Sequence, residues 1–220
     1  MSKQWLIIGI SGATCGGKTT IANNLNSIFP GSRVLSQDSY FLPVDDDRHV
    51  WIPELNHINF DILTSLDMDK MHSDIKEIVA GSICKIDTSK SKCSERSPLI
   101  SGNLTDLQEK IKEMLIKKKV NILIVEGFCI FYHKPIESLC NLKYFVTLNK
   151  EECHKRRLKR VYEPPDCPGY FEHCVWPEYL RQLEDVKSTI KNVHYISEFT
   201  EDPIKVVLND LVLLLDGVIE

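Results

Sequence analysis

The sequence predicts a three-layer α/β fold with about five parallel strands. Short apolar runs alternate along the chain with longer amphipathic stretches. Strands of about four to six apolar residues that are separated by helices are typical of a parallel sheet covered on both faces. A glycine-rich turn stands where the first predicted strand gives way to the first predicted helix. The 220 residues are within the range of one compact domain, so we expect 1–220 to form a single domain.

The individual elements are predicted from the spacing of apolar residues, taken in chain order. The apolar run WLIIGI at 5–10 predicts a strand buried on both faces. In 18–29, apolar residues recur at spacings of three and four, which predicts an amphipathic helix. The same criteria predict further strands at 33–36, 122–125, 144–148 and 193–196, and further helices at 67–79, 104–117, 150–161, 177–189 and 203–215.

Two stretches break this alternation. Residues 39–59 contain proline and aspartate and follow the second predicted strand. Residues 81–102 are polar and rich in serine. This composition favours a mobile excursion from the domain, although a short hairpin within it is also compatible with the sequence.

The composition limits the class of protein. Hydrophobic residues make up 43% of the chain and charged residues 26%, which is ordinary for a globular protein. The formal net charge of −4 argues against a general nucleic-acid binder, because such proteins are usually basic. No apolar stretch approaches the length of a membrane span or of a signal peptide's apolar region. We therefore expect a soluble cytoplasmic protein, with a monomer favoured, whose partners are small molecules rather than nucleic acid or membrane.

The eight cysteines are scattered, and no two form a C-x-x-C pair. In a cytosolic protein such cysteines are expected to be reduced thiols that serve mostly as small buried residues. The neighbours Cys153-His154 and His173-Cys174 could bind zinc, but the paired spacing of a zinc site is absent. Free thiols are therefore the favoured interpretation.

A phosphate-binding motif carries most of the functional prediction. The pattern G-x-x-x-x-G-K-[ST] is matched by Gly12, Ala13, Thr14, Cys15, Gly16, Gly17, Lys18 and Thr19. The glycines let backbone N–H groups turn toward a phosphate, and the following helix adds the positive end of its dipole. In this motif Lys18 reaches the β- and γ-phosphates of the nucleotide, and the Thr19 hydroxyl ligates Mg²⁺. We therefore expect ATP and Mg²⁺. The alternative, a glycine-rich turn with an accidental Lys-Thr, is disfavoured by the flanking strand and helix.

Two acidic residues, Asp38 and Glu126, follow predicted strands directly. In a parallel sheet of this kind, ligands bind at the carboxyl ends of the strands. A kinase needs one carboxylate to take or orient the proton of the acceptor hydroxyl, and an acid to hold the metal directly or through water. We therefore name Asp38 and Glu126, with Lys18, as candidate catalytic residues. The alternative is that each acid only caps the next helix or turn. The adjacent aspartates at 45–47 indicate a solvated loop.

Three arginines, Arg156, Arg157 and Arg160, lie in the helix predicted at 150–161, before a proline-rich turn, and the first and last share one helix face. Guanidinium groups suit phosphate oxygens and the charge that builds during transfer. Three prolines and a glycine in 163–170 form a stiff turn suited to a closing flap. We therefore predict a helical lid over about 153–175. A surface helix paired with its acidic neighbours, or a nuclear-import cluster, is the alternative.

These motifs, in this order, resemble the nicotinamide riboside kinases, a branch of the uridine-kinase-like P-loop group. The resemblance covers nearly the whole chain, and the lid string is its most specific part. It is densest at Ile8 to Gly12, Gly17 to Thr20, Ser36 to Asp38, Asn59 to Asp61, Val125 to Phe128, Arg156-Arg157, Arg160 to Asp166, Pro168 to Phe171 and Val175 to Pro177. It implies the P-loop nucleoside-kinase fold and an enzyme that phosphorylates the ribose 5′-hydroxyl of nicotinamide riboside, and of nicotinic acid riboside, to give the mononucleotide for NAD synthesis.

The resemblance also implies roles for individual residues. Asp38 would be the proton acceptor and, with Thr19, a metal-site residue, and Glu126 would assist both. Phe60 and Tyr162 would enclose the nicotinamide ring, whose positive charge suits aromatic faces. Asp61 and Arg157 would hold the ribose hydroxyls, and Asp166 would accept from the carboxamide. The full set of implied acceptor contacts is Asp38, Ser39, Tyr40, Phe41, Phe60, Asp61, Arg157, Tyr162, Glu163 and Asp166. The implied ATP contacts are the P-loop, Thr20, Arg156, Arg160, Val161 and Tyr162.

The chain departs from the family pattern in several places. Phe60 stands where tyrosine is expected, which keeps the stacking surface but loses a hydroxyl. Cys15 and Gly16 replace more usual polar residues, and the segment 81–119 is longer than the pattern. Adenine contacts are expected near 200–202.

Three other functions stay open on the sequence alone. A uridine–cytidine-type nucleoside kinase would share the P-loop and the lid and differ around Phe60, Asp61 and Asp166. A GTPase switch would need an N-K-x-D string, and the string at 149–152 (NKEE) lacks the aspartate. A catalytically silent nucleotide-binding protein is disfavoured because the candidate catalytic residues are all present.

Overall fold

The computed structural model of the protein describes residues 4–81 and 102–218 and confirms the predicted α/β fold. A five-stranded sheet has the order β2-β5-β1-β6-β7, and all of its neighbouring strands are parallel. Apart from its two end residues, the excursion predicted at 81–102 lies outside the described residues. The strands are β1 (Gln4–Gly12), β2 (Arg33–Ser36), β5 (Val120–Glu126), β6 (Leu142–Val146) and β7 (Val193–Ile196).

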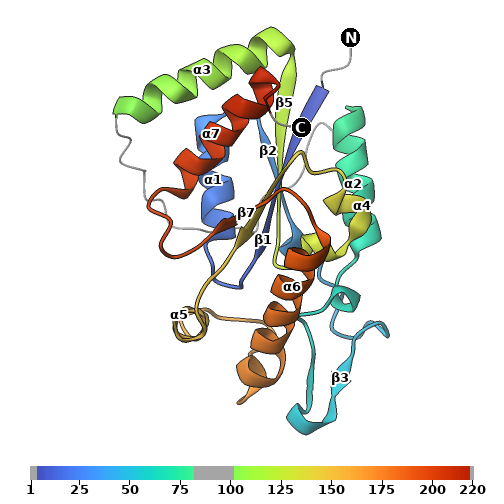
Figure 1. Ribbon diagram of the computed structural model, residues 1–220. Helices are drawn as coiled ribbons and strands as arrows, with labels where there is room; N and C mark the ends of the chain where they lie inside the picture. The colour runs from blue at the N-terminus through green and yellow to red at the C-terminus, as the bar shows by residue number, and fades with distance from the viewer. Residues whose placement is uncertain (1–3, 82–101, 219–220) are drawn as a thin grey trace.

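Helices cover both faces of this sheet, as Figure 1 shows. A short helix, α5 (Lys150–Arg157), lies apart from both layers, beyond the end of the sheet. One face carries α1 (Lys18–Ile28), α3 (Gly102–Lys118) and α7 (Pro203–Asp216), and the other carries α2 (Met68–Ala80), α4 (Lys134–Glu137) and α6 (Trp176–Thr189). Single turns are formed by Gln37–Tyr40, Pro53–Leu55, Leu63–Ser65 and Ile130–Tyr132, and a π-helical turn by Phe171–Val175.

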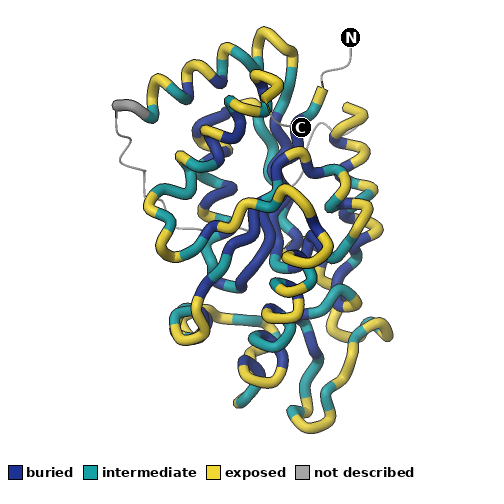
Figure 2. The backbone as a smooth tube through the Cα atoms, in the orientation of Figure 1, coloured by how far each residue is buried: buried dark blue, intermediate teal, exposed yellow. Residues whose placement is uncertain are grey.

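The two faces have separate hydrophobic cores. Along β1, Ile8 and Ile10 pack against α1 and α7, while Ile7 packs on the side of α2 and α6. Successive side chains of a strand point to opposite faces, so a strand covered on both sides needs apolar residues at every position. Figure 2 shows the sheet as the buried centre of the molecule. This double burial is the reason that the strands are continuous apolar runs in the sequence.

The ends of two helices are fixed by local side chains. The Asp67 carboxylate accepts from Lys70 N at the start of α2, and the Asp202 carboxylate accepts from Ile204 N and Lys205 N at the start of α7. Both helices end at a glycine with positive φ, +78° at Gly81 and +75° at Gly217. Asp202, in the stretch expected to contact adenine, thus caps a helix.

Most predicted bounds agree with the structure to within one or two residues, and the larger differences are one helix end, one shifted strand and one unpredicted strand pair. The helix predicted at 150–161 ends at Arg157, because Leu158 and Val161 are 74% and 92% exposed and offer no face to bury. The strand predicted at 144–148 is β6 (Leu142–Val146); the Val146 carbonyl accepts from Ala13 N, which ends its pairing with β1. The stretch 39–59 holds an unpredicted antiparallel pair, β3 (Trp51–Ile52) and β4 (His57–Ile58).

The carboxyl ends of β1, β2 and β5 lie together at the lower end of Figure 1. Helix α5 and the β3–β4 hairpin lie at the same end. The residues that follow β1, β2 and β5 in the sequence therefore lie at this end of the sheet.

Among the helices of residues 4–81 and 102–218, none has the length and apolarity that crossing a membrane requires.

Ile75→Ala in α2 should lower the free energy of unfolding by about 2–5 kcal/mol, because Ile75 is fully buried and its loss leaves a cavity. The matched control is Ile116→Ala in α3, where the side chain is 77% exposed and the change should stay within about 0.5 kcal/mol. Denaturant unfolding followed by circular dichroism measures both. Equal losses would show that Ile75 does not belong to the core.

Candidate functional site

The P-loop motif forms the turn between β1 and α1. Gly12 has φ +115°, and a Cβ atom on it would lie 2.2 Å from the Val146 carbonyl oxygen. Gly17 has φ +95° and forms the N-cap of α1. The loop is attached to β6 by the hydrogen bond from Ala13 N to the Val146 carbonyl (2.9 Å). Glycine is thus required at position 12 by close packing and at position 17 by backbone conformation.

Lys18 is buried at the base of this turn. Its Nζ donates to the carbonyl oxygens of Gly12 (3.1 Å) and Ala13 (2.8 Å). Burial lowers the pKa of Lys18, and the carboxylates of Glu126 and Asp38 oppose this shift. An ammonium group withdrawn from water interacts strongly with an incoming anion, because the surroundings screen the charge poorly.

Glu126 ends β5 and is held by hydroxyl groups from two other elements. Ser36 Oγ donates to Oε1 of Glu126, and Thr19 Oγ1 donates to Oε2 (3.3 Å). Ser36 is the register partner of Glu126 in the pairing of β2 with β5. Burial raises the pKa of Glu126, while Lys18 and the two hydroxyl groups act in the opposite direction. Asp38, in the turn after β2, is exposed.

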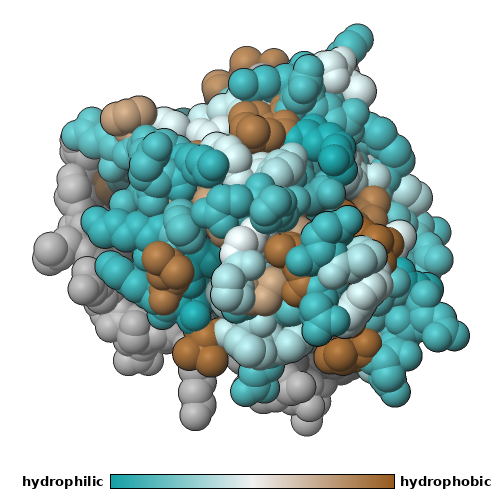
Figure 3. Space-filling view, turned by 90° about the horizontal axis from the view of Figure 1, so that it is seen from below, coloured by the Kyte–Doolittle hydropathy of each residue, from teal (hydrophilic) through white to brown (hydrophobic). Residues whose placement is uncertain are grey.

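One cavity joins these groups. It brings together the P-loop, both candidate carboxylates and the last of the three arginines. Figure 3 views the molecule from this end; the surface is mostly hydrophilic, with separate hydrophobic patches. The cavity is lined by Thr14, Cys15, Gly16, Gly17, Lys18, Thr19, Asp38, Glu126, Phe128 and Arg160.

The hydroxyl and carboxylate oxygens that line this cavity are suitable ligands for Mg²⁺. The Thr19 hydroxyl lies 3.3 Å from Glu126, and Asp38 lines the same space. In the part of the chain that the structure describes, no three His, Cys, Asp or Glu side chains are grouped as a metal site. Mg²⁺ does not need such a group, because it usually takes one or two carboxylates and completes its shell with water and phosphate oxygens.

Helix α5 packs against the back of the P-loop. Cys153 Sγ donates to the Thr14 carbonyl (3.4 Å), and Arg156 NH1 donates to the Cys15 carbonyl (3.4 Å). Arg156 also donates from Nε to Glu152 (2.7 Å). The cysteines within the described ranges are free, and all but Cys167 are buried. The cysteine on α5 thus contributes packing and one weak hydrogen bond to the loop.

Arg157 joins three parts of the site. Its Nε and NH2 donate to Asp166 Oδ2 (2.6 Å) and Oδ1 (3.0 Å), and NH1 donates to Thr14 Oγ1 (3.3 Å). Its NH2 lies 3.6 Å from Asp61 Oδ2, and its guanidinium lies over the ring of Tyr162 (4.3 Å). Burial acts to lower the pKa of Arg157, but the carboxylates outweigh it and the net shift is upward.

Asp61 is buried beside Arg157. The Tyr170 hydroxyl donates to Asp61 Oδ2 (3.0 Å) and accepts from the backbone N of Phe60 (2.8 Å). Burial raises the pKa of Asp61, and Arg157 and the Tyr170 hydroxyl oppose that shift. The hydrogen bonds therefore hold the 60–61 backbone against the start of the π-helical turn.

An aromatic cluster surrounds Phe60. Its ring makes edge contacts with Phe41 (6.2 Å), His49 (5.2 Å) and His57 (5.8 Å). Phe41 in turn stacks on Phe128 (6.0 Å), which lines the phosphate cavity. A continuous aromatic surface thus leads from Phe60 to the P-loop.

The remaining predicted residues differ in where the structure places them. Tyr40 is buried and its hydroxyl donates to Asp74 on α2 (2.8 Å), so it faces the core. Ser39, Thr20, Val161 and Glu163 are exposed. Tyr162 lies beside the P-loop, its hydroxyl 3.6 Å from Cys15 Sγ, and burial raises its pKa to about 12.

Four residues of the site were missed as individual candidates: Ser36, Phe128, Cys153 and Tyr170. Ser36 could have been found from its place at the end of a strand, beside the strand that ends in Glu126. The contacts of Tyr170 and Cys153 join segments distant in the sequence, so no local signal pointed to them.

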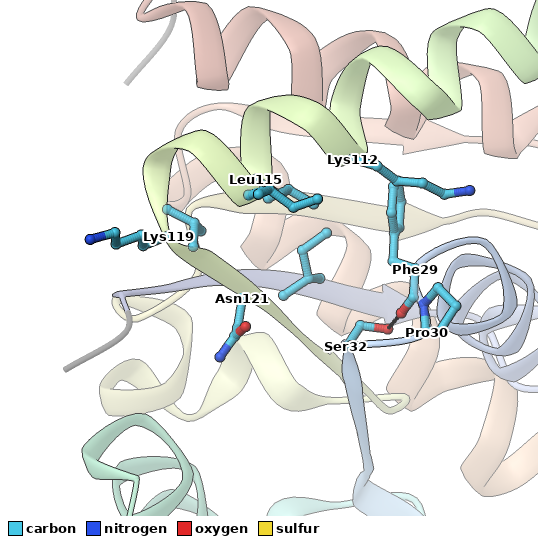
Figure 4. Close-up of a pocket in the computed structure, with 11 residues that line it drawn as sticks. Phe29, Pro30, Ser32, Lys112, Leu115, Lys119 and Asn121 are labelled. Carbon is cyan, nitrogen blue, oxygen red and sulfur yellow. Dashed lines mark hydrogen bonds between the residues drawn. The ribbon is translucent and has the colours of Figure 1, made fainter. Parts of the chain in front are cut away.

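A larger cavity, of about 700 Å³, lies at the opposite end of the sheet (Figure 4). Its walls come from the end of α1, the end of α3 and the start of β5, including Phe29, Leu115 and Ile122. The residues that line it include two lysines but no carboxylate. It therefore lacks the acid–base groups that phosphoryl transfer requires.

Comparison with known proteins agrees with this geometry. Residues 7–192 match the phosphoribulokinase / uridine kinase family. Nicotinamide riboside kinase 1 of Rattus norvegicus is 37% identical over 190 residues, covering 86% of this chain and 84% of that protein. The same-named protein of Homo sapiens is 38% identical over 208 residues, covering 94% and 92%. The chain belongs to the nicotinamide riboside kinase branch of this family. It is accordingly an ATP-dependent kinase.

Among solved structures, the chain resembles a possible uridine kinase from Bacillus stearothermophilus. The TM-score is 0.48 at 14% identity, and the match covers 88% of this chain and 90% of that one. This likeness concerns the fold, and no functional inference rests on it.

Lys18→Met should weaken the binding of ATP–Mg²⁺ by about 10- to 100-fold, because charge-assisted hydrogen bonds worth about 1.5–3 kcal/mol are lost. Isothermal titration calorimetry measures the affinity, and circular dichroism confirms that the variant is folded. The control is Lys187→Met, which removes an exposed ammonium group from α6. Unchanged affinity in Lys18→Met would remove Lys18 from the nucleotide site.

Proposed function

We propose that the protein transfers the γ-phosphoryl group of ATP, with Mg²⁺, to the ribose 5′-hydroxyl of nicotinamide riboside, and also of nicotinic acid riboside. The observation that carries this proposal is the shared cavity of Lys18, Thr19, Asp38 and Glu126, next to the aromatic surface around Phe60. The relatives named nicotinamide riboside kinase support the choice of acceptor. The product would be the mononucleotide, a precursor of NAD.

The nucleotide end of the site would work mainly by positioning and electrostatics. Lys18 would exchange its two loop carbonyls for phosphate oxygens, and Arg156 and Arg160 would approach from α5 and the lid. Mg²⁺ would be held by the Thr19 hydroxyl and Asp38. Glu126 would orient that hydroxyl, from which it accepts a hydrogen bond. The metal, when bound, neutralises charge on the phosphate oxygens.

At the acceptor end, Asp38 would take the proton of the 5′-hydroxyl. It is exposed and lines the phosphate cavity, so its carboxylate can reach both the acceptor and the transferred group. The cationic nicotinamide ring would lie against Phe60 and Tyr162, and Asp61 with Arg157 would meet the ribose hydroxyls. Asp166 already accepts from Arg157 through both oxygens, but each oxygen keeps a second lone pair for the carboxamide.

Uridine or cytidine phosphorylation is the second candidate, since the family includes uridine kinases. The charge around Phe60 separates the two candidates. Asp61 and Asp166 lie on either side of Arg157, and carboxylates near an aromatic surface favour a cationic ring over a neutral uracil.

The alternative of another class is a catalytically silent nucleotide-binding protein. Such a protein would consume no ATP in response to any nucleoside.

The deciding experiment is an acceptor panel with the purified protein. Nicotinamide riboside, nicotinic acid riboside, uridine and cytidine are compared by kcat/KM under ATP and Mg²⁺. The proposal requires that the two pyridine ribosides exceed uridine and cytidine. A preference for the pyrimidine nucleosides would replace it with the second candidate.

Asp38→Asn should lower kcat by about 10²–10⁴-fold while leaving the protein folded, because the amide cannot accept the hydroxyl proton. The control is Asp47→Asn, an exposed aspartate in the loop before β3. Steady-state kinetics with saturating ATP measures both. A variant as fast as the parent would exclude Asp38 as the proton acceptor.

Phe60→Ala should raise KM for the riboside roughly tenfold and leave KM for ATP nearly unchanged, because ring stacking is lost only at the acceptor. Leu180→Ala is the control, since Leu180 on α6 is 45% exposed. Parallel increases in both KM values would argue against stacking at Phe60.

A further inference from the structure

One contact joins the β3–β4 hairpin to the proline-rich turn of the lid. His57, in β4, is half-buried, and its ring lies 5.8 Å from that of Phe60 and 4.9 Å from that of Tyr170. It therefore stands between the aromatic residue proposed to stack on the acceptor and the tyrosine that binds Asp61. No motif in the sequence singled it out.

Both ring nitrogens of His57 face carbonyl oxygens. Nδ1 lies 2.7 Å from the carbonyl oxygen of Ile58, and Nε2 lies 3.1 Å from that of Pro165. A carbonyl oxygen can only accept, and a neutral imidazole carries a single N–H group. The tautomer that carries its proton on Nε2 donates to the Pro165 carbonyl, and this hydrogen bond joins β4 to the proline-rich turn.

This contact lies next to residues that are proposed to bind the acceptor. Pro165 precedes Asp166, whose carboxylate accepts two hydrogen bonds from Arg157. At the other end of the turn, a Cβ atom on Gly169 would lie 3.7 Å from Leu55 of the hairpin. The hairpin and the turn thus pack together, and His57 makes the polar contact between them.

Charged and titratable side chains of the described residues surround His57. Tyr170 faces it directly, with Asp61 and Arg157 behind the tyrosine ring. On the turn, Asp166 follows Pro165, and His49 lies across the ring of Phe60.

We propose that His57 is a positioning residue that, through the contact of its ring with the Pro165 carbonyl, ties the β3–β4 hairpin to the lid turn and so sets the gap in which the acceptor ring meets Phe60. The proposal rests on the proposed function only in placing the acceptor ring at Phe60. Loss of this contact releases the turn, so KM for the acceptor rises while KM for ATP does not follow it.

The test compares the parent with His57→Phe, which keeps a ring but removes both ring nitrogens, and with His57→Gln, which removes the ring. KM for the acceptor and for ATP is measured for each protein. Both variants should show an acceptor KM raised about threefold to tenfold, as expected for loss of a hydrogen bond, with ATP KM unchanged. His72→Phe, a half-buried histidine on α2, is the matched control and should behave as the parent.

A second readout needs no acceptor. Hydrogen–deuterium exchange of the peptide covering 163–170 should be slower in the parent than in both variants. Equal exchange in the three proteins, or an acceptor KM in the variants equal to that of the parent, would overturn the role of His57. If no nucleoside is phosphorylated at all, the proposed function fails, and the exchange comparison still decides whether His57 ties the turn.

Discussion

The structure depends on a pair of opposite charges, Lys18 and Glu126, brought out of water at the carboxyl ends of adjacent parallel strands. Burial disfavours the charged form of each, as the directions of their pKa shifts show. The cost is offset by the loop carbonyls that accept from Lys18 and by the hydroxyl groups of Ser36 and Thr19 that donate to Glu126. These groups are therefore held in place before any nucleotide arrives, which is what electrostatic catalysis of phosphoryl transfer requires.

A second constraint links the two halves of the site. Arg157 contacts the P-loop through Thr14, the segment after β4 through Asp61 and the proline-rich turn through Asp166. A single guanidinium group with five donors in a fixed plane can bind all three at once, which a lysine could not do. Because Asp61 and Arg157 are both buried, each depends on the other to offset its desolvation. The geometry of the P-loop and that of the segments carrying Asp61 and Asp166 are thus held by the same side chain.

Much of the fold was predictable because its signals are local. The strands are covered on both faces, so each is a continuous apolar run, and helices such as α2 carry both an apolar stripe and an aspartate cap. The errors came where tertiary contacts overrule local pattern. The helix predicted at 150–161 stops at Arg157, because the residues beyond it have no surface to bury against, and the β3–β4 pair is too short to leave a period in the sequence.

By itself, the sequence determined the phosphate-binding turn and the strand-end positions of Asp38 and Glu126, because glycine spacing and strand ends are properties of neighbouring residues. Only the tertiary structure decided that Ser36 binds Glu126, that Arg157 lies between Asp61 and Asp166, and that His57 contacts the lid turn. The tertiary structure also shows that the Tyr40 hydroxyl donates to Asp74 on α2, so that this side chain faces the core. These contacts join residues up to 108 positions apart, and their partners are fixed by how helices and loops pack on the sheet rather than by any spacing along the chain.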